Sequence, residues 1–550
     1  MQIIECVPNF SEGNDLNVIK QITDEIEMVA GARLLNVDPG RATNRTVVTF
    51  VGSPEAVTEA AFRVIKKAGE LIDMSKHRGE HPRMGATDVC PLIPVANISM
   101  EETAAWAQKL AKRVGEELSL PVYLYESAQP NKDRSNLSVV RAGEYEGFFK
   151  KIKLPEWKPD FGPAEFDVKR GATVIGARDF LVAYNVNLNT TSVRRANAIA
   201  FDIREAGRKI KNEKGEEVVK PGSLKSVKAI GWYIEEYGIA QISINLTNIN
   251  VTPMHIAFDE TCKKAETRGI RVTGSELVGL IPLKAMLDAG KYFLKKQKRS
   301  AGVSERELIR IAVISMGLDE LAPFKPEEKI IEYMLMDKSD NRLVSMNLSD
   351  FADETASESP APGGGSIAAY IGALGVSLGT MVANLSSHKK GWDERWEEFS
   401  NWAEKGQHYK NELVRLVDAD TKAFNQIMDA FSLPKSTDEE KVIRKTAIQN
   451  ATKRAIEIPF AVMENAYGSM EVIAAMAETG NPNSVSDAGV GALCARSAVL
   501  GAFMNVRINA AGFDNKDFVN EIITKGKDIE NKAIETEKLI LKIVNERIGM

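Results

Sequence analysis

The sequence predicts two α/β subdomains of the split βαβ, ferredoxin-like type, followed by an all-α helical bundle domain. Up to about residue 336, short apolar runs typical of strands alternate with helical patterns, whereas only long helical patterns follow. Each of the first two parts has the order strand, helix, strand, strand, helix, strand, which is that of a split βαβ unit. We therefore expect subdomains at 1–178 and 179–336, a polar linker at 337–349 and a helical domain at 350–550.

The first subdomain has clear start signals for its helices. Apolar residues at helical spacing follow Asp15, and Ser99 with Glu102 three residues later forms a capping box for a third helix. Its expected strands cover 3–7, 33–37, 46–51 and 121–126, and its expected helices cover 15–29, 56–72 and 100–118.

Turn and cap residues also organise the second subdomain. Gly207 marks the expected end of a helix that begins at Ser192, and Gly238 lies where two strands within 228–245 meet. Thr252 and Pro253 begin another helix. The remaining expected elements are strands at 180–188 and 271–283, helices at 304–317 and 326–336, and bundle helices at 364–386, 396–431, 438–468, 484–511 and 514–546.

The composition argues against several classes of function. A net charge of -5 without clustered Lys and Arg argues against nucleic-acid binding. The four cysteines show no CxxC spacing, so a zinc site and a disulfide framework are disfavoured and a reducing, cytoplasmic compartment is expected. The first ten residues lack the basic and apolar regions of a signal peptide. Residues 361–388 carry no charge and are long enough to span a bilayer, but their Gly, Ser, Thr and Asn content favours a tightly packed buried helix.

The densest chemistry lies at 77–91, where two of the five histidines are four residues apart. Glycine and proline break any helical period there, so we expect a loop, and His77 and His81 do not share a helical face as a metal pair would. General acid–base catalysis by one of them is the favoured interpretation, with a solvated surface loop as the alternative. Asp38, expected on a turn after a strand, either orients a histidine or forms a structural Asx turn.

The helical domain carries two further features. Residues 360–366 are Gly-rich and enter a helix whose N–H groups can receive an anion, while a flexible hinge is the alternative. Asp420 lies in an apolar helical stripe, with Asp418 expected on the opposite face. A buried carboxyl has a raised pKa that suits proton transfer, and the alternative is a structural acid paired with Arg496 or Arg507. The stripe consists of Leu413, Leu416, Val417, Phe424 and Ile427.

Several stretches resemble the formimidoyltransferase-cyclodeaminase family. ECVPNFSEG at 5–13, TNRT at 43–46 and HPRMGATDVCP at 81–91 are similar to glutamate formimidoyltransferase, and APGGGS at 361–366 with VDAD at 417–420 is similar to formimidoyltetrahydrofolate cyclodeaminase. The resemblance implies a bifunctional folate enzyme of histidine degradation. It would transfer the formimino group of N-formimidoyl-L-glutamate to tetrahydrofolate, releasing glutamate. It would then convert 5-formimidoyl-tetrahydrofolate to 5,10-methenyltetrahydrofolate and ammonia.

The resemblance also implies roles for individual residues. His81 rather than His77 matches the transferase histidine, Asp38 matches a nearby acid and Asp420 matches the cyclodeaminase acid. Tetrahydrofolate is the implied co-substrate, no metal is implied, and we expect a homo-oligomer without nucleic-acid or membrane partners. The stretches that match folate contacts are Gly162, Pro163, Ala164, Glu165, Phe166, Asp167, Val168, Lys169, Arg170 and Gly171, and Gly222, Ser223 and Leu224.

Two alternatives to this reading stay open. In the first, the chain is a transferase whose helical domain is a cyclohydrolase-like or oligomerisation module. In the second, the whole chain is a non-catalytic folate-binding scaffold.

Overall fold

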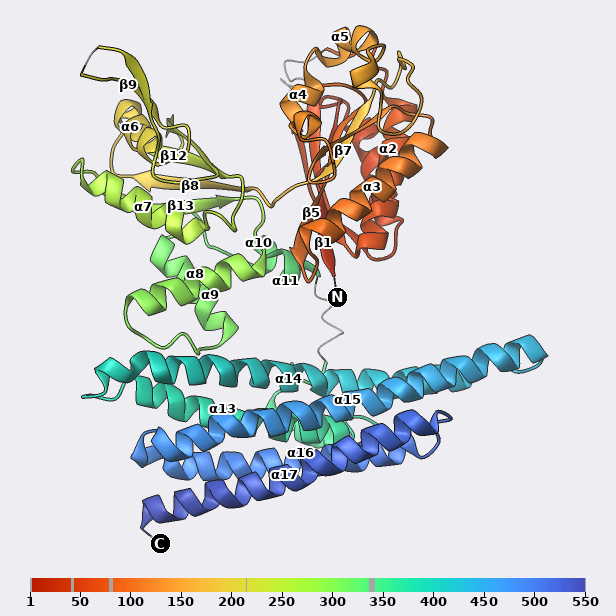
Figure 1. Ribbon diagram of the computed structural model, residues 1–550, viewed down its shortest axis with the longest axis vertical. Helices are drawn as coiled ribbons and strands as arrows, with labels where there is room; N and C mark the ends of the chain where they lie inside the picture. Colours follow the sequence, from red (N-terminus) through yellow and green to blue (C-terminus); the bar gives the residue numbers. More distant parts are fainter. Residues whose placement is uncertain (1, 41–43, 79–82, 214, 336–341, 550) are drawn as a thin grey trace. The chain divides into compact units, whose positions relative to one another are not determined.

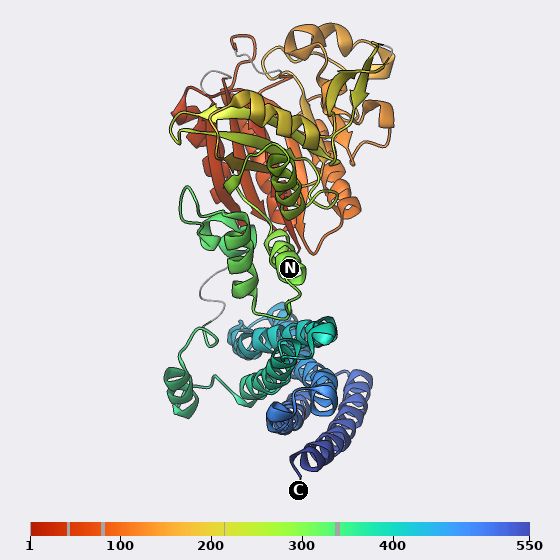
Figure 2. The same cartoon turned by 90° about the vertical axis from the view of Figure 1, so that its left-hand side faces the viewer.

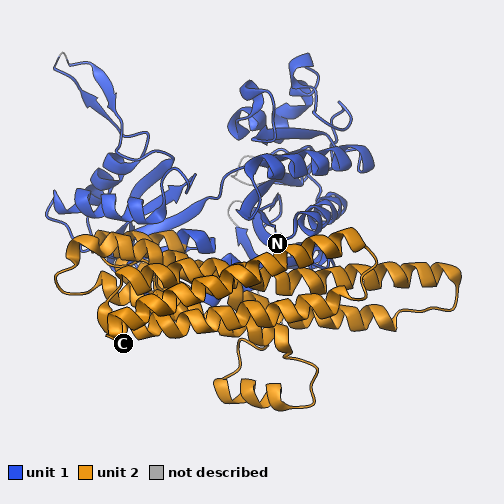
Figure 3. Ribbon diagram, turned by 60° about the horizontal axis from the view of Figure 1, so that its bottom comes forward, with its two compact units in different colours: residues 1–285, 316–335 blue, residues 286–315, 336–550 orange. Residues whose placement is uncertain are grey.

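A computed structural model of the protein describes residues 2–40, 44–78, 83–213, 215–335 and 342–549 (Figure 1). The chain forms two compact units, residues 1–285 with 316–335 and residues 286–315 with 336–550 (Figure 3). The first unit contains mixed sheets with helices, and the described part of the second unit is almost entirely helical. The predicted order of an α/β part followed by a helical part is therefore confirmed.

The first subdomain is a sheet with α1, α2 and α3 packed on one face and α4 and α5 packed on the other face near β6 and β7 (Figure 1). Its elements are β1 (Ile3–Cys6), β2 (Asn9–Phe10), α1 (Leu16–Glu27), β3 (Ala32–Gly40), β4 (Arg45–Gly52), α2 (Pro54–Leu71), β5 (Thr87–Ala96), α3 (Met100–Glu117), β6 (Val122–Glu126), α4 (Leu137–Arg141), α5 (Glu144–Lys151) and β7 (Thr173–Ala177). The antiparallel order β3-β4-β1-β5 is that of a ferredoxin-like unit, and β7 and β6 extend it in parallel beyond β5.

Local sequence signals explain where these helices begin. The Asp15 carboxylate accepts hydrogen bonds from the backbone N–H groups of Asn17 and Val18, which caps α1. The predicted capping box of Ser99 and Glu102 is present at the start of α3. The apolar faces of α1, α2 and α3 then pack on one face of the sheet, and a smaller apolar cluster with α4 and α5 covers part of the other face.

Two expectations about this subdomain are wrong. Thr87–Pro91 belongs to β5 rather than to a loop. The loop was expected because glycine and proline break the helical period of 77–91, but the strand that contains Thr87–Pro91 pairs with β1 and β2 in irregular register. Asp38 lies within β3, opposite Val47 of β4, and not on a turn after the strand.

The second subdomain repeats the same strand order. Its elements are β8 (Val182–Leu188), α6 (Val193–Ile203), β9 (Arg208–Lys211), β10 (Glu217–Lys220), β11 (Val227–Ile234), β12 (Ile239–Leu246), α7 (Met254–Glu266) and β13 (Val272–Val278). The antiparallel order β11-β12-β8-β13 corresponds to β3-β4-β1-β5 of the first subdomain. The β9–β10 hairpin is an insertion that the sequence patterns did not reveal, because both strands are highly charged and exposed.

Helix α6 ends earlier than predicted. Its last helical residue is Ile203, and Gly207 lies in the turn that leads to β9 with a positive φ of 58°. The helix stops there because the backbone N–H groups of Ser223 and Leu224 donate to the carbonyl oxygens of Asp202 and Ile203.

The remaining elements are helices. They are α8 (Leu283–Lys296), α9 (Glu305–Met316), α10 (Pro326–Lys329), α11 (Ile331–Leu335), α12 (Leu348–Ala356), α13 (Gly364–Ser387), α14 (Trp396–Ser432), α15 (Asp438–Thr479), α16 (Val485–Ala510) and α17 (Lys516–Ile548). The five long helices α13 to α17 pack side by side around a common core, and Figure 2 shows them nearly end-on. All five were predicted, but α15 continues past the expected end at 468 to Thr479.

Helix α15 passes through Pro459 without ending. Proline has no N–H, so the carbonyl oxygen of Ala455 loses its helical partner. The side-chain amide of Asn509 on α16 donates to that oxygen at 2.7 Å, which replaces the missing hydrogen bond.

Small residues allow α13 to pack closely within the bundle. A Cβ on Gly375 would lie 2.9 Å from the Gly491 carbonyl oxygen, and a Cβ on Gly372 would lie 3.1 Å from the Cβ of Ala498. By length and composition alone, α13 and the stretch Pro482–Ala510 are also able to cross a membrane, and 61% and 50% of their most apolar windows lie buried inside the protein. The close packing of α13 agrees with the expected buried helix.

Candidate active sites

The described part of the histidine-rich stretch is held by a buried network. His77 is buried, its Nε2 lies 2.9 Å from the carbonyl oxygen of Asn44, and its Nδ1 lies 3.2 Å from Nε of Arg83. Arginine can only donate, so Nδ1 accepts and the ring is the neutral Nε2–H tautomer. Burial also lowers the pKa of His77. Arg83 in turn makes a two-point ion pair with Glu146 at 2.8 and 2.6 Å. His77 therefore has a structural environment, while His81 lies outside the described residues.

A second buried group in this motif was not singled out by the sequence. Asp88 is only 1% exposed and accepts from the Met84 backbone N–H at 2.9 Å and from the Arg141 guanidinium at 2.6 Å. Burial raises the pKa of Asp88, and the Arg141 charge opposes that rise. Asp88 therefore joins the motif to α4 and holds one arginine in place.

The first predicted folate stretch lies directly against the residues that follow His81. The Ala86 N–H donates to the Arg170 carbonyl oxygen at 2.8 Å, and the Ala172 N–H donates to the Met84 carbonyl oxygen at 3.1 Å. The contact is so close that a Cβ on Gly85 would lie 2.3 Å from the Ala172 carbonyl oxygen. The structure thus brings the described end of the histidine motif together with the stretch 162–171.

One of the two acids within that stretch, Asp167, is neutralised locally. Asp167 accepts from the backbone N–H groups of Lys169 and Arg170, and its other oxygen lies 2.6 Å from Nε of Arg170. Its charge is therefore balanced before any ligand binds.

The second predicted folate stretch does not share this location. Gly222 and Ser223 line a separate cavity of about 660 Å³ beside α6 and the base of the β9–β10 hairpin. Four basic side chains also line it, namely Arg208, Lys220, Lys264 and Arg268. Among the described residues, none of the stretch 162–171 lines the cavity at Gly222 and Ser223.

A larger cationic cavity of about 700 Å³ lies on the face of the first sheet opposite α1, α2 and α3. Residues of β11 and of the segment after β12 close it from the second subdomain. The cavity is lined by four basic residues, Arg45, Arg141, Arg178 and Lys228, and by two acidic ones, Glu126 and Asp179. It therefore favours a ligand with more than one negative charge. Its lining is Val7, Asn9, Arg45, Val47, Val89, Pro91, Tyr125, Glu126, Leu137, Arg141, Arg178, Asp179, Leu181, Ser226, Lys228, Thr247 and Asn248.

Sequence reasoning missed most of this cavity because its side chains come from many elements. The stretches that resemble the transferase family include Val7, Asn9, Arg45, Val89 and Pro91 of its lining, but Arg45 is the only one of its four basic residues among them. Asp38 is exposed on β3 and does not line the cavity, but its charge acts on Arg45. Burial lowers the pKa of Arg45, and the charges of Asp88 and Asp38 oppose that effect.

The second candidate site lies where α14 meets the first turn of α13. A Cβ on Gly365 would lie 2.2 Å from Oδ1 of Asp420, so the carboxyl rests directly on the helix N-terminus. Ser366 Oγ lies 3.1 Å from Oδ2 of the same carboxyl. Burial raises the pKa of Asp420, and hydrogen bonds from Ser366 oppose the rise. The Gly-rich entry to α13 and Asp420, which the sequence offered as separate features, therefore form one site.

The predicted helical stripe around Asp420 is partly wrong. Asp418 was expected on the opposite face but is only 7% exposed, whereas Phe424 was expected inside and is 38% exposed. The reason is that Asp418 receives the backbone N–H groups of Leu343 and Val344 at 2.9 and 3.2 Å, so the chain before α12 covers it.

The alternative was that Asp420 is a structural acid paired with Arg496 or Arg507. Arg496 lies 3.5 Å from Glu537, and the guanidinium of Arg507 lies 5.0 Å from the ring centre of Phe503. In the part of the chain that the structure describes, neither arginine pairs with Asp420.

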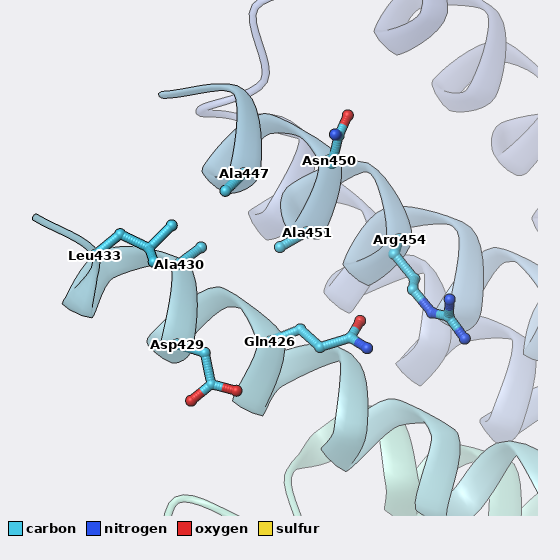
Figure 4. Close-up of a pocket in the computed structure, with 8 residues that line it drawn as sticks. All are labelled: Gln426, Asp429, Ala430, Leu433, Ala447, Asn450, Ala451 and Arg454. Carbon is cyan, nitrogen blue, oxygen red and sulfur yellow. The ribbon is translucent and has the colours of Figure 1, made fainter. Parts of the chain in front are cut away.

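Farther along α14, a groove of about 410 Å³ separates this helix from α15 (Figure 4). Its polar side chains are exposed, and Asp420 is not part of it. The lining consists of Gln426, Asp429, Ala430, Leu433, Ala447, Asn450, Ala451 and Arg454. Among the described residues, no group of three or more His, Cys, Asp or Glu side chains is arranged to hold a metal ion.

Comparison with known proteins assigns the whole chain to one family. Residues 3–178 match the N-terminal subdomain of the formiminotransferase domain, residues 183–336 match the formiminotransferase domain, and residues 347–528 match formiminotransferase-cyclodeaminase. A formimidoyltransferase-cyclodeaminase from Gallus gallus is 44% identical over 550 residues, which cover 99% of each chain. The chain belongs to the formimidoyltransferase-cyclodeaminase family.

Single-function relatives match the two parts of this family member separately. A glutamate formimidoyltransferase from Thermoplasma acidophilum is 42% identical over 315 residues, covering 57% of this chain and 99% of its own. A methenyltetrahydrofolate cyclohydrolase from Methylorubrum extorquens is 38% identical over 198 residues, covering 36% of this chain and 91% of its own.

Proposed function

We propose that this protein is a bifunctional folate enzyme. It transfers the formimino group of N-formimidoyl-L-glutamate to tetrahydrofolate and then cyclodeaminates 5-formimidoyl-tetrahydrofolate to 5,10-methenyltetrahydrofolate and ammonia. The observation that carries the proposal is the 44% identity to a formimidoyltransferase-cyclodeaminase over 99% of both chains. The cationic cavity and the Asp420 site support one reaction each.

The cationic cavity suits the first reaction because N-formimidoyl-glutamate carries two carboxylates. Arg45, Arg141, Arg178 and Lys228 provide the opposite charge, and Asp88 fixes the direction of Arg141. Holding the amino-acid part in this way leaves the amidine carbon free to meet N5 of tetrahydrofolate.

The transfer itself requires one proton to move. N5 attacks the amidine carbon, a tetrahedral centre forms, and the bond to the glutamate nitrogen breaks. In the proposed mechanism His81 accepts the proton of N5 and gives it to the departing glutamate nitrogen, with Asp38 orienting the histidine. The folate contacts proposed for this step are the stretches 162–171 and 222–224.

The Asp420 site suits the second reaction. N10 attacks the same carbon, now attached to N5, and the amino group leaves as ammonia when it receives the N10 proton. We propose that Asp420 carries that proton, since burial raises the pKa of its carboxyl above its ordinary value. The residues invoked for the two steps use only proton transfer, and we propose that the enzyme needs no metal.

The remaining parts of the proposal concern the cell and the assembly. The protein is a cytoplasmic homo-oligomer that acts on small molecules and has no nucleic-acid or membrane partner. The absence of CxxC spacing among its four cysteines supports the reducing compartment, and its net charge of -5 supports the absence of a nucleic-acid partner.

A two-stage assay tests both activities in the full chain. Wild type given N-formimidoyl-glutamate and tetrahydrofolate should release glutamate, develop the absorbance of the methenyl product and release ammonia. His81→Ala should lose transfer yet still cyclise supplied 5-formimidoyl-tetrahydrofolate, and Asp420→Asn should do the reverse. Cyclisation at the wild-type rate by the Asp420 variant would refute its assigned role.

The same assay separates the competing functions. The similarity to a methenyltetrahydrofolate cyclohydrolase makes that activity the second candidate for the helical part. Hydrolysis of supplied 5,10-methenyltetrahydrofolate, without ammonia from 5-formimidoyl-tetrahydrofolate, would favour it. Binding of tetrahydrofolate without any turnover would favour a scaffold.

A further inference from the structure

The hydroxyl group of Ser366 lies between one acceptor that never changes and one that titrates. Ser366 is completely buried in the first turn of α13. Its Oγ lies 2.9 Å from the Val417 carbonyl oxygen, 3.1 Å from Oδ2 of Asp420 and 3.3 Å from Oγ1 of Thr421. One hydroxyl has a single proton, so it cannot donate fully to Val417 and Asp420 at once.

We propose that Ser366 is a positioning residue whose O–H turns between the Val417 carbonyl and the Asp420 carboxyl as that carboxyl gains and loses its proton. When Asp420 is a carboxylate, Ser366 donates to Oδ2. When Asp420 is the acid, its O–H donates to Ser366 Oγ and Ser366 donates to Val417. The inference rests on the proposed cyclodeaminase function of Asp420.

Proton counting favours this arrangement over a fixed hydrogen bond. If Ser366 donated only to Val417, the lone pairs of its Oγ would face the lone pairs of the Asp420 carboxylate. If Ser366 donated only to Asp420, its hydroxyl proton would face the proton of the Asp420 acid. Turning the O–H satisfies both protonation states without moving any heavy atom. The half-buried Asp420 carboxyl can then exchange a proton with substrate without leaving a polar atom unpaired.

The groups of α13 and α16 that lie beside Asp420 are neutral. The first turn of α13 contributes Gly364, Gly365 and Ser366, and the amide of Asn505 on α16 lies against Gly364. On α14 itself, Asp418 is engaged by the backbone before α12. Within residues 342–549, the causes acting on the pKa of Asp420 are burial and the hydrogen bonds from Ser366, with no charged group of α13, α15 or α16 among them.

The test is the pH dependence of cyclodeamination by Ser366→Ala in the full chain, with 5-formimidoyl-tetrahydrofolate as substrate. This variant keeps the backbone N–H and removes only the hydroxyl. We expect kcat to fall about 10- to 100-fold with KM within about 3-fold, because the proton carrier and not substrate binding is affected. The acid limb of the kcat profile should move to higher pH, since the carboxylate loses a donor.

Ser377→Ala is the matched control. Ser377 lies on the same helix, but its hydroxyl donates to the Ala373 carbonyl of its own helix at 2.7 Å, so its removal should leave the profile unchanged. Ser366→Cys keeps a weak donor and should give an intermediate profile, and it carries the test if the alanine variant does not fold. A wild-type kcat and acid limb in the folded Ser366 variant would overturn the inference.

Asp420→Asn distinguishes a failure of the inference about Ser366 from a failure of the proposed catalytic role of Asp420. If it is inactive while Ser366→Ala behaves like wild type, only the role of Ser366 is wrong. If it cyclises normally, the catalytic role of Asp420 is wrong, and the inference about Ser366 is overturned with it.

Discussion

Replacing Gly365 by alanine tests whether the first turn of α13 sets the position of the Asp420 carboxyl. A Cβ at this position would lie 2.2 Å from Oδ1, 2.5 Å from Cγ and 2.6 Å from Oδ2 of Asp420, whereas ordinary contact begins at 3.4 Å. The carboxyl must therefore retreat by about 1 Å, because all three of its nearest atoms clash at once.

The size of the effect follows from this displacement. Moving a reacting group by about 1 Å can cost about 100-fold in rate, so we expect cyclodeamination to fall by roughly two orders of magnitude. Folding should change little, because the clash costs about 1–3 kcal/mol while alanine in place of glycine stabilises a helix by about 0.5–1 kcal/mol. The predicted signature is a large loss of cyclodeaminase activity with a small loss of stability.

Gly364→Ala is the control for this prediction. It makes the same change one residue earlier, but its Cβ would lie 3.3 Å from the side-chain nitrogen of Asn505, which can move aside. Methenyl absorbance from supplied 5-formimidoyl-tetrahydrofolate measures both variants, and thermal unfolding measures their stability. Equal rates in Gly365→Ala and Gly364→Ala would refute the reasoning, and transfer of the formimino group should be unaffected in both.

Three further predictions concern charge. Burial raises the pKa of Asp420, so the folded chain holds that proton more tightly than the unfolded chain and the carboxyl costs stability as the pH rises above its ordinary value of 3.8. Asp420→Asn should therefore melt at a higher temperature than wild type at pH 7, with the gain shrinking as the pH falls toward 3.8; a constant gain at all pH values would contradict this. Lys228→Met should raise the KM for N-formimidoyl-glutamate about 5-fold at unchanged kcat. Lys225→Met should leave the KM unchanged, because the Lys225 ammonium lies outside the cavity, 3.7 Å from a Glu205 carboxylate oxygen. Asp88→Asn should destabilise the first unit by about 3 kcal/mol in chemical unfolding and lower transfer activity, because it leaves Arg141 without its ion-pair partner; wild-type stability would show that the pair is dispensable.

Features encoded over a few residues could be predicted from the sequence. Ser99 and Glu102 form their capping box because both partners lie within one turn, and the long helices follow from apolar spacing alone. Asp420 was found in the same way, because helical spacing predicts an apolar residue at its position and a carboxyl there is costly unless it has a function or a partner.

Features that depend on distant segments could not be predicted. Asp418 was placed on the wrong face because the backbone that buries it, at Leu343 and Val344, lies far away in sequence and is not part of its helix. The four cations of the large cavity come from β4, α4, β11 and the end of β7, so no local pattern joins them. Likewise, only the folded chain shows that Gly365 touches Asp420.

Asp418 and Asp420 contact the two ends of the segment that runs from Leu343 to Gly365. One carboxyl holds the chain at Leu343 and the other rests on Gly365, so both ends of the intervening segment meet the same turn of α14. Helix α12, which lies between those ends, has no buried residue. The loop is therefore closed at its base, and the entropy of closure depends only weakly on its length, with each doubling costing about 0.6 kcal/mol. Residues around α12 should accept insertions, such as an affinity tag or a fluorescent reporter, at little cost to either site.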